Sequence, residues 1–186
     1  MPIRDIVLKE NSFYHIYNRG LNKKNIFLNS SNYERFYLSI IRYLQIYTGI
    51  RILSYSFLPN HFHLILLSVI SGKEISDFMR KIQQSYAIYF KLKHLNSSPD
   101  SKGKPVFGGR FKAKLISNED YLYQCQAYVN YNAVKHKIVT NVFDWEYSSI
   151  HQVLGSKIQQ EVIPISGYYK DIKKFKDVEF LDLEES

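Results

Sequence analysis

Two histidines separated by one residue, His61 and His63, have a spacing that could support chemistry. They stand in an apolar run after the turn residues Pro59 and Asn60, and this run predicts a buried strand over residues 61–69. Side chains two residues apart on a strand point to the same face, so the two imidazoles form a natural pair of metal ligands. The same pattern also fits two histidines that only pack or lie at the surface.

A second candidate pair, Tyr128 and Asn132, is four residues apart in a stretch with helical periodicity. Such residues share one face of a helix, so the phenol and the amide point the same way. Asn132 offers a carbonyl oxygen that suits Mg²⁺ or Mn²⁺, and Tyr128 offers a phenol that could act as a nucleophile. The charge of Lys135 could help this phenol to ionise. The alternative is that Tyr128 is simply one of 16 tyrosines that fill a core.

Periodicity and turn signals predict the elements that must position these side chains. Three helices are expected. The first begins at a capping box at Ser31, the second begins at a capping box at Ser71 and ends at about His94, and the third begins at Ser117. The expected strands are residues 13–19, 50–58, 61–69 and 110–116. This order is the βαββαβ pattern of a ferredoxin-like sandwich, an α+β fold with an antiparallel sheet, plus an extra C-terminal helix. The first and third strands are central in this topology, and the third carries the histidine pair.

The charge of the chain favours a polyanionic partner. The net charge is +8, and residues 177–186 hold five acidic and no basic residues, which leaves 25 basic and 12 acidic residues in residues 1–176. Nucleic acid is the usual partner of so basic a body, although a basic protein without such a partner has the same charge. Cys125 is the one cysteine, so an intrachain disulfide and a cysteine zinc cluster are excluded.

The N-terminus lacks the apolar segment of a signal peptide, and no apolar run reaches the roughly 18 residues of a membrane span. A cytoplasmic protein with no membrane partner is expected. We predict one domain at residues 1–155 and a charged extension at residues 156–186. The acidic end of this extension could be solvated, fold over the basic surface as a DNA mimic, or dock on a partner.

A basic stripe is predicted on the last strand, because its basic residues alternate and so project from one face. It could follow a DNA backbone, although charge also protects an edge strand against aggregation. The residues of this stripe are Arg110, Lys112 and Lys114. The other histidines have no spacing that suggests a ligand and are predicted to be structural. They are His15, His94, His136 and His151.

Five stretches of the chain resemble motifs of the HUH single-tyrosine transposases, the insertion-sequence-200/605 group, and most of all the REP-associated tyrosine transposases. Residues 59–64 (PNHFHL) resemble the histidine–hydrophobic–histidine motif, and residues 128–136 (YVNYNAVKH) resemble the catalytic-helix motif. The other three are YHI with RG at 14–20, FGGRFKAKLI at 107–116, and DW with YSS at 144–149. Together they span about residues 12–150 in the order that the family uses.

The resemblance implies a transposase-type endonuclease that cleaves and rejoins single-stranded DNA and recognises DNA hairpins. His61 and His63 match two ligands of a divalent cation, Mg²⁺ or Mn²⁺. Asn132 matches the third ligand, which is Gln in some branches. Tyr128 matches the nucleophile, whose attack leaves a 5′-phosphotyrosine and a free 3′-OH that can be rejoined without ATP. A proline commonly follows the asparagine in this family, and Ala133 stands there instead, so the helix end is expected to differ.

Two other functions fit part of the pattern. A replication initiator or relaxase uses the same metal and tyrosine, but the short chain leaves no room for a helicase domain. A catalytically inactive nucleic-acid-binding module would display aromatic side chains on the open face of the sheet, where this sequence places histidines. The related transposases include monomers and homodimers, and both states stay open for this chain.

Overall fold

The computed structural model describes residues 6–95 and 103–153. The predicted charged extension at 156–186 falls wholly outside these ranges. Within the described ranges, every helix is too short or too polar to span a membrane.

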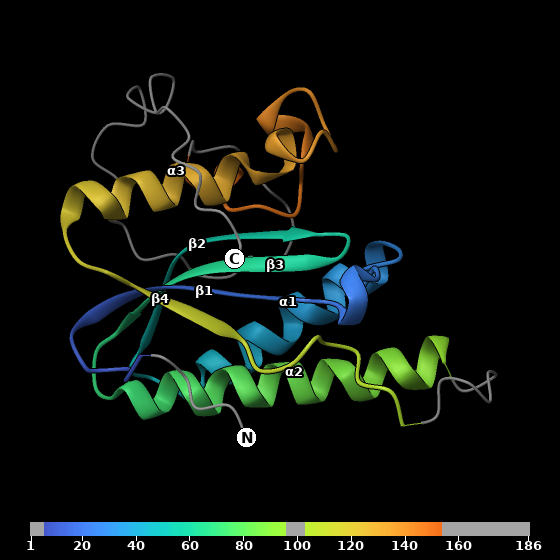
Figure 1. Cartoon of the computed structure of the whole chain (residues 1–186), viewed down its shortest axis with the longest axis horizontal. Helices are drawn as coiled ribbons and strands as arrows, with labels where there is room; N and C mark the ends of the chain where they lie inside the picture. Colours follow the sequence, from blue (N-terminus) through green and yellow to red (C-terminus); the bar gives the residue numbers. More distant parts are fainter. Residues whose placement is uncertain (1–5, 96–102, 154–186) are drawn as a thin grey trace.

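The sheet has four antiparallel strands in the order β2-β3-β1-β4, so the prediction of a ferredoxin-like sheet with central first and third strands is confirmed (Figure 1). The strands are β1 (Ser12–Arg19), β2 (Ile50–Leu58), β3 (His61–Ser68) and β4 (Lys112–Ile116). β4 begins two residues later than predicted. Gly109 precedes it with a φ of 140°, a conformation that interrupts an extended strand.

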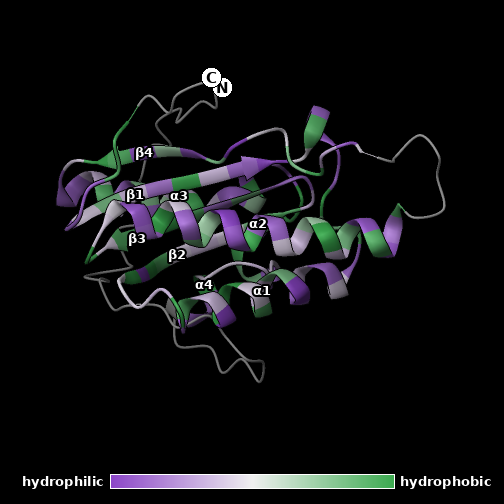
Figure 2. Ribbon diagram, turned by 90° about the horizontal axis from the view of Figure 1, so that it is seen from below, coloured by the Kyte–Doolittle hydropathy of each residue, from purple (hydrophilic) through white to green (hydrophobic). Residues whose placement is uncertain are grey.

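Helices cover both faces of this sheet. Figure 1 shows α1 (Ser30–Leu44) and α2 (Gly72–His94) on one face and α3 (Glu119–Lys135) on the other. Figure 2 shows hydrophilic and hydrophobic residues alternating along α1 and α2, the pattern of helices with one buried side. The short helices η1 (Leu21–Lys23), η3 (Val142–Asp144) and α4 (Ile150–Val153) complete the described elements. The extra C-terminal helix predicted from the sequence is α3.

The N-cap residues of the three long helices agree only partly with the prediction. Ser71 caps α2 as predicted, because its side chain accepts a hydrogen bond from a backbone N–H of the first turn. The capping box at Ser31 is wrong, since α1 starts at Ser30 and has Asn29 at its N-cap position, two residues before the predicted cap. The cap at Ser117 is also wrong, since Asn118 takes this role for α3. Asparagine caps a helix about as well as serine does, so the pattern alone could not choose between neighbours.

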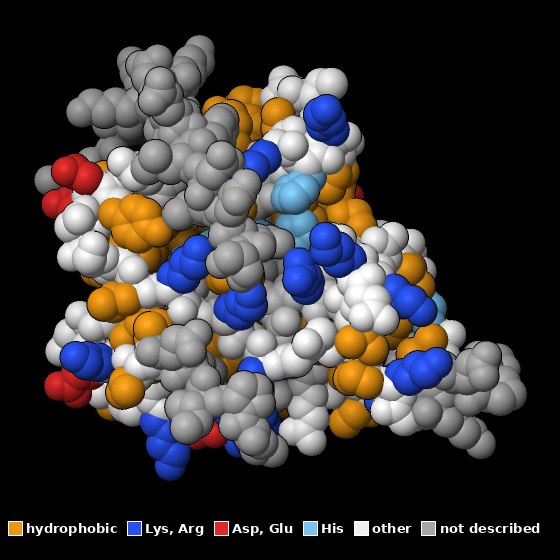
Figure 3. All heavy atoms as spheres, viewed as in Figure 1, with side chains coloured by type: hydrophobic (Ala, Val, Ile, Leu, Met, Phe, Trp, Pro, Cys, Tyr) orange, Lys and Arg blue, Asp and Glu red, His pale blue; other side chains and the backbone are white. Residues whose placement is uncertain are grey.

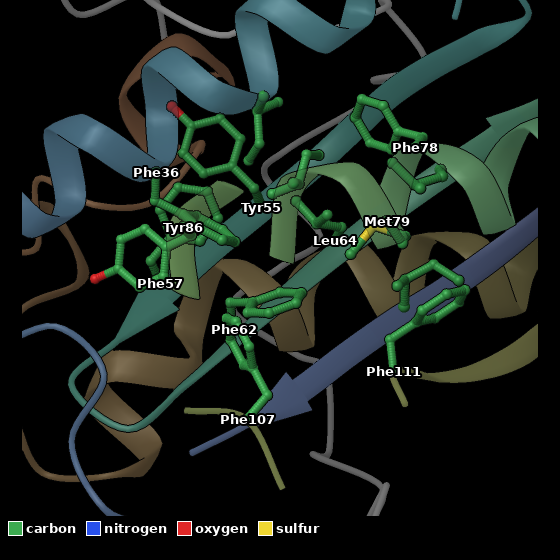
Figure 4. Close-up of a cluster of buried hydrophobic side chains, with 14 of the residues drawn as sticks. Phe36, Tyr55, Phe57, Phe62, Leu64, Phe78, Met79, Tyr86, Phe107 and Phe111 are labelled. Carbon is green, nitrogen blue, oxygen red and sulfur yellow. The ribbon is translucent and has the colours of Figure 1, made fainter. Parts of the chain in front are cut away.

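Two hydrophobic cores lie on the two faces of the sheet. The larger one, between the sheet and α1 with α2, is mostly aromatic and includes Phe36, Phe62 and Tyr86 (Figure 4). The smaller one, between the sheet and α3, includes Ile65 and the fully buried Cys125. Cys125 therefore packs as a small hydrophobic residue in this core. The smaller core packs α3 against the sheet.

The segment after α3 fastens this helix to the edge strand β2. The indole N–H of Trp145 donates to the carbonyl oxygen of Phe57 at 3.1 Å. Ser149 accepts from the backbone N–H of Tyr55 at 3.0 Å and donates to Oδ1 of Asn130 at 2.7 Å. Residues 144–149 are thus a packing segment that connects β2 with the middle of α3.

Candidate catalytic site

β3 presents His61 and His63 to the face of the sheet that α3 covers. Phe62 between them points to the opposite face and packs in the aromatic core (Figure 4). His63 is fully buried and His61 is 6% exposed. Their ring centroids are 5.0 Å apart, with an interplanar angle of 87°. The two imidazoles therefore share one face of the sheet, as their spacing on a strand requires.

α3 brings Tyr128 and Asn132 to the same place. The ring of Tyr128 is edge-on to His63, with 5.7 Å between centroids and an angle of 89°. Asn132, one helical turn later, is fully buried and close enough to His61 to influence the pKa of that imidazole. A nucleophile candidate and three ligand candidates thus meet between one central strand and one helix of a single chain.

The donor atoms at this place suit a divalent cation. Nε2 of His61 and Oδ1 of Asn132 are buried atoms that make no hydrogen bond of good geometry, although the Asn132 amide is near enough to His61 to raise the pKa of that imidazole. Such atoms are costly to bury unless something binds them. Nδ1 of His61 is occupied by Oδ1 of Asn60 at 2.5 Å, so a cation would meet this ring at Nε2. Among the described residues, no three His, Cys, Asp or Glu side chains form a metal-binding group. The third protein ligand would therefore be the Asn132 amide, with water or DNA oxygens completing the coordination.

Two further histidines lie against this pair, although both were predicted to be structural. Nε2 of His15 is 2.8 Å from Nδ1 of His63. The ring of His136 is 4.9 Å from that of His61, centroid to centroid. His15 faces His63 because β1 pairs with β3, and His136 reaches His61 because α3 ends there. Neither relationship leaves a spacing signal in the sequence.

Burial keeps the imidazoles of the site neutral. Loss of hydration lowers the pKa of His61 to about 3, and the charge of His136 acts in the same direction. Burial likewise lowers the pKa of His15 to about 3 and holds the pKa of His63 well below its ordinary value. Neutral imidazoles have a lone pair to offer a cation, so burial prepares the ligands for binding.

Positive side chains flank the histidines on the same face. Lys112 is paired with Tyr17 across β1 and β4, and its Nζ is 5.9 Å from the centroid of the Tyr17 ring. Lys114 is paired with His15 in the same register. Figure 3 shows histidine side chains at the surface with Lys and Arg side chains around them. Two of the three predicted stripe residues therefore border the site.

Arg110 does not belong to this stripe, because it precedes β4. It instead lines a groove of about 790 Å³ between α2 and residues 105–111. Arg80 and Lys91 of α2 line the same groove, and Phe111 contributes an aromatic wall. This groove lies on the α2 side of the sheet, away from the histidines. The prediction that all three basic residues project from one face of a strand is wrong for Arg110.

Comparison with known proteins gives a family match over most of this fold. The model of the family described as "Transposase IS200 like" matches residues 9–132, a range that contains His61, His63, Tyr128 and Asn132. No curated protein sequence matches the chain.

Solved structures show the same fold. A REP-associated tyrosine transposase bound to a REP hairpin is similar with a TM-score of 0.69 and 21% identity, over 92% of this chain and 94% of that one. The tRNA(His) guanylyltransferase of Saccharomyces cerevisiae has a TM-score of 0.50 and 12% identity, over 74% of this chain and 65% of that one. At these identities the likeness concerns the fold alone. Since the family model covers about two thirds of the sequence, this chain belongs to the IS200-like transposase family.

Proposed function

We propose that this transposase-family protein cleaves and rejoins single-stranded DNA through a covalent bond between Tyr128 and a 5′-phosphate. The observation that supports this proposal is the position of the Tyr128 ring, 5.7 Å from that of His63 and on the same face as the buried Nε2 of His61 and Oδ1 of Asn132. A tyrosine that only filled a core would be expected beside apolar side chains, and not beside buried polar atoms that could bind a metal ion.

His61, His63 and Asn132 would hold the divalent cation, Mg²⁺ or Mn²⁺. When bound, such an ion withdraws negative charge from a phosphodiester and orients it. Burial of the two imidazoles and of the amide keeps bulk water away from the ligand atoms. The protein thereby prepares the binding geometry before DNA arrives.

The proposed reaction exchanges one phosphoester for another. The phenolic oxygen of Tyr128 loses its proton to solvent and bonds to phosphorus, while the bond from phosphorus to the 3′ oxygen breaks. The 3′ oxygen takes up a proton and leaves as a hydroxyl. Lys135, with Nζ 5.0 Å from the centroid of the Tyr128 ring, stabilises the negative charge that develops on the phenol. Rejoining is the same exchange with a 3′-OH as the attacking group.

For DNA binding we propose Lys112 and Lys114 beside the histidines, and Arg110 in the groove on the other side of the sheet. The edge strand β4 lies between these two basic regions. A DNA strand that crosses β4 could contact both, and a hairpin stem next to the cleaved strand fits such an extended surface. The hairpin in the structure of the REP-associated transposase supports this choice of substrate.

We also propose that each chain cleaves with its own tyrosine. In the described residues the helix that carries Tyr128 packs on the strand that carries His63 within the same chain. A monomer therefore has all four candidate residues at one site.

The test is a covalent-adduct assay with Mn²⁺ and labelled single-stranded hairpin DNA taken from sequence that flanks the gene. Label that stays with the protein on a denaturing gel is the expected result. It should disappear in Tyr128→Phe and in the double variant His61→Ala/His63→Ala, and it should persist in Tyr131→Phe, a matched change on the same helix. An adduct that survives in Tyr128→Phe would refute the assignment of the nucleophile.

A further inference from the structure

The hydrogen bond between His15 and His63 has no role in the proposed reaction so far. Nε2 of His15 and Nδ1 of His63 are 2.8 Å apart, and the two rings stack at 5.1 Å with an angle of 22°. His15 is 3% exposed and His63 is fully buried. Both residues lie on central strands, so the backbone holds the pair rigidly.

We propose that His15 is a positioning residue that fixes the tautomer and the orientation of His63 for cation binding. This inference rests on the proposed metal site. Because Nδ1 of His63 faces His15, a cation would bind His63 through Nε2. A neutral imidazole that offers Nε2 as a lone pair must have its proton on Nδ1. That N–H then donates to Nε2 of His15, which accepts it.

The tautomer of His63 also determines that of His15. If Nε2 of His15 accepts, a neutral His15 has its own proton on Nδ1. The opposite arrangement, in which His15 donates from Nε2, would put the proton of His63 on Nε2 and block the cation. The hydrogen bond therefore exists in two tautomeric forms, and only one of them is compatible with metal binding.

This role is normally filled by a carboxylate or a backbone carbonyl, which can only accept. An imidazole can accept or donate, so here the bound cation selects the form. The ring of His15 also lies edge-on to Tyr128, with 6.0 Å between centroids and an angle of 74°. His15 thus lies against both the nucleophile candidate and the ligand candidate.

The experiment measures Mn²⁺ affinity in the absence of DNA, by electron paramagnetic resonance of free Mn²⁺. His15→Phe keeps a ring but removes the acceptor, and we expect it to weaken binding about 10–100-fold, the usual effect of losing such a partner. His15→Gln puts an amide oxygen near the former Nε2 and should restore most of the affinity. His94→Phe, which removes a histidine bonded to Asn32 on the other side of the sheet, should leave affinity unchanged.

A second measurement uses the wild-type protein, so it holds even if His15→Phe fails to fold. Long-range ¹H–¹⁵N correlation spectra with bound Zn²⁺, a diamagnetic probe, should show His63 protonated on Nδ1. Protonation on Nε2, or wild-type Mn²⁺ affinity in His15→Phe, would overturn the inference. Absence of Mn²⁺ binding in the wild-type protein would instead refute the metal site itself, so the two failures are distinguishable.

Discussion

Nζ of Lys135 lies 5.0 Å from the centroid of the Tyr128 ring, two helical turns along α3. Replacing Lys135 with Met keeps the aliphatic length and removes the charge. We expect adduct formation to slow about 10-fold, in line with a loss of about 1.4 kcal/mol of charge stabilisation. Single-turnover rates at saturating DNA measure this effect. Lys73→Met, at the exposed start of α2, is the control, and equal rates in both variants would exclude a role for Lys135.

Charge removal near β4 should weaken DNA binding in a salt-dependent way. We expect Lys112→Gln and Lys114→Gln each to reduce the slope of log K against log salt by about 0.7, the effect of one phosphate contact on a single strand. Fluorescence anisotropy with a labelled hairpin at several salt concentrations gives this slope. Arg42→Gln on α1 removes one charge from the far face and should leave the slope unchanged. If Arg42→Gln lowers the slope by a similar amount, the effect comes from the net charge of the protein and not from a contact of Lys112 or Lys114 with DNA.

Arg110 should contribute to DNA binding from the opposite side of the sheet. Arg110→Gln is expected to weaken hairpin binding while a short unstructured oligonucleotide binds as before, because the groove lies away from the histidines. The ratio of the two affinities is the measurement. If both DNAs lose affinity to the same extent, the groove does not bind the hairpin specifically, and the prediction is wrong.

Use of the tyrosine within one chain can be tested by mixing two inactive variants. Tyr128→Phe retains the metal ligands, and His61→Ala/His63→Ala retains the tyrosine. Exchange of α3 between chains would restore an active site and produce adduct. We expect no adduct from the mixture, because Tyr128 and His63 already meet within one chain.

The metal-free protein should lose stability as the pH falls. The pKa of His15 is about 3 in the folded protein and about 6.5 when unfolded, so between these values only the unfolded chain binds the proton. Stability from this residue is complete above pH 6.5 and falls by about 2 kcal/mol by pH 5. Urea unfolding in EDTA at several pH values measures the slope. His15→Phe should give a shallower slope, and an unchanged slope would contradict the burial of a neutral His15.

The link between the packing segment and α3 should be measurable as stability. Ser149→Ala removes the donor to Asn130 and the acceptor for a backbone N–H of β2. Both partners are buried, so we expect a loss of about 1–3 kcal/mol in the free energy of unfolding. Urea denaturation tests this value. Ser12→Ala, which removes an exposed hydrogen bond at the start of β1, should cost much less.

The sequence predicted those parts of the molecule that periodicity determines. Alternation placed His61 and His63 on one face, and helical spacing placed Tyr128 and Asn132 on another element of the same site. The contact of His15 with His63 depends on the register between β1 and β3, which no local pattern reports.

Other details depend on choices between nearly equal neighbours. Asn118 rather than Ser117 caps α3, although both residue types serve well at this position. Arg110 continues the alternation of Lys112 and Lys114 in the sequence, but β4 begins only at Lys112, so Arg110 lies outside the strand. The alternation correctly placed Lys112 and Lys114 on one face of β4, but it could not show at which residue the strand begins.

The most direct test of the central claim is the location of the DNA on the protein. After reaction with Mn²⁺ and hairpin DNA, nuclease treatment and proteolysis leave a nucleotide on one peptide, which mass spectrometry can sequence. We expect the nucleotide on Tyr128, attached through a 5′-phosphate, and its absence when His61 and His63 are both replaced by Ala. A nucleotide on any other residue, or a modified Tyr128 that persists without the histidines, would contradict the proposed site.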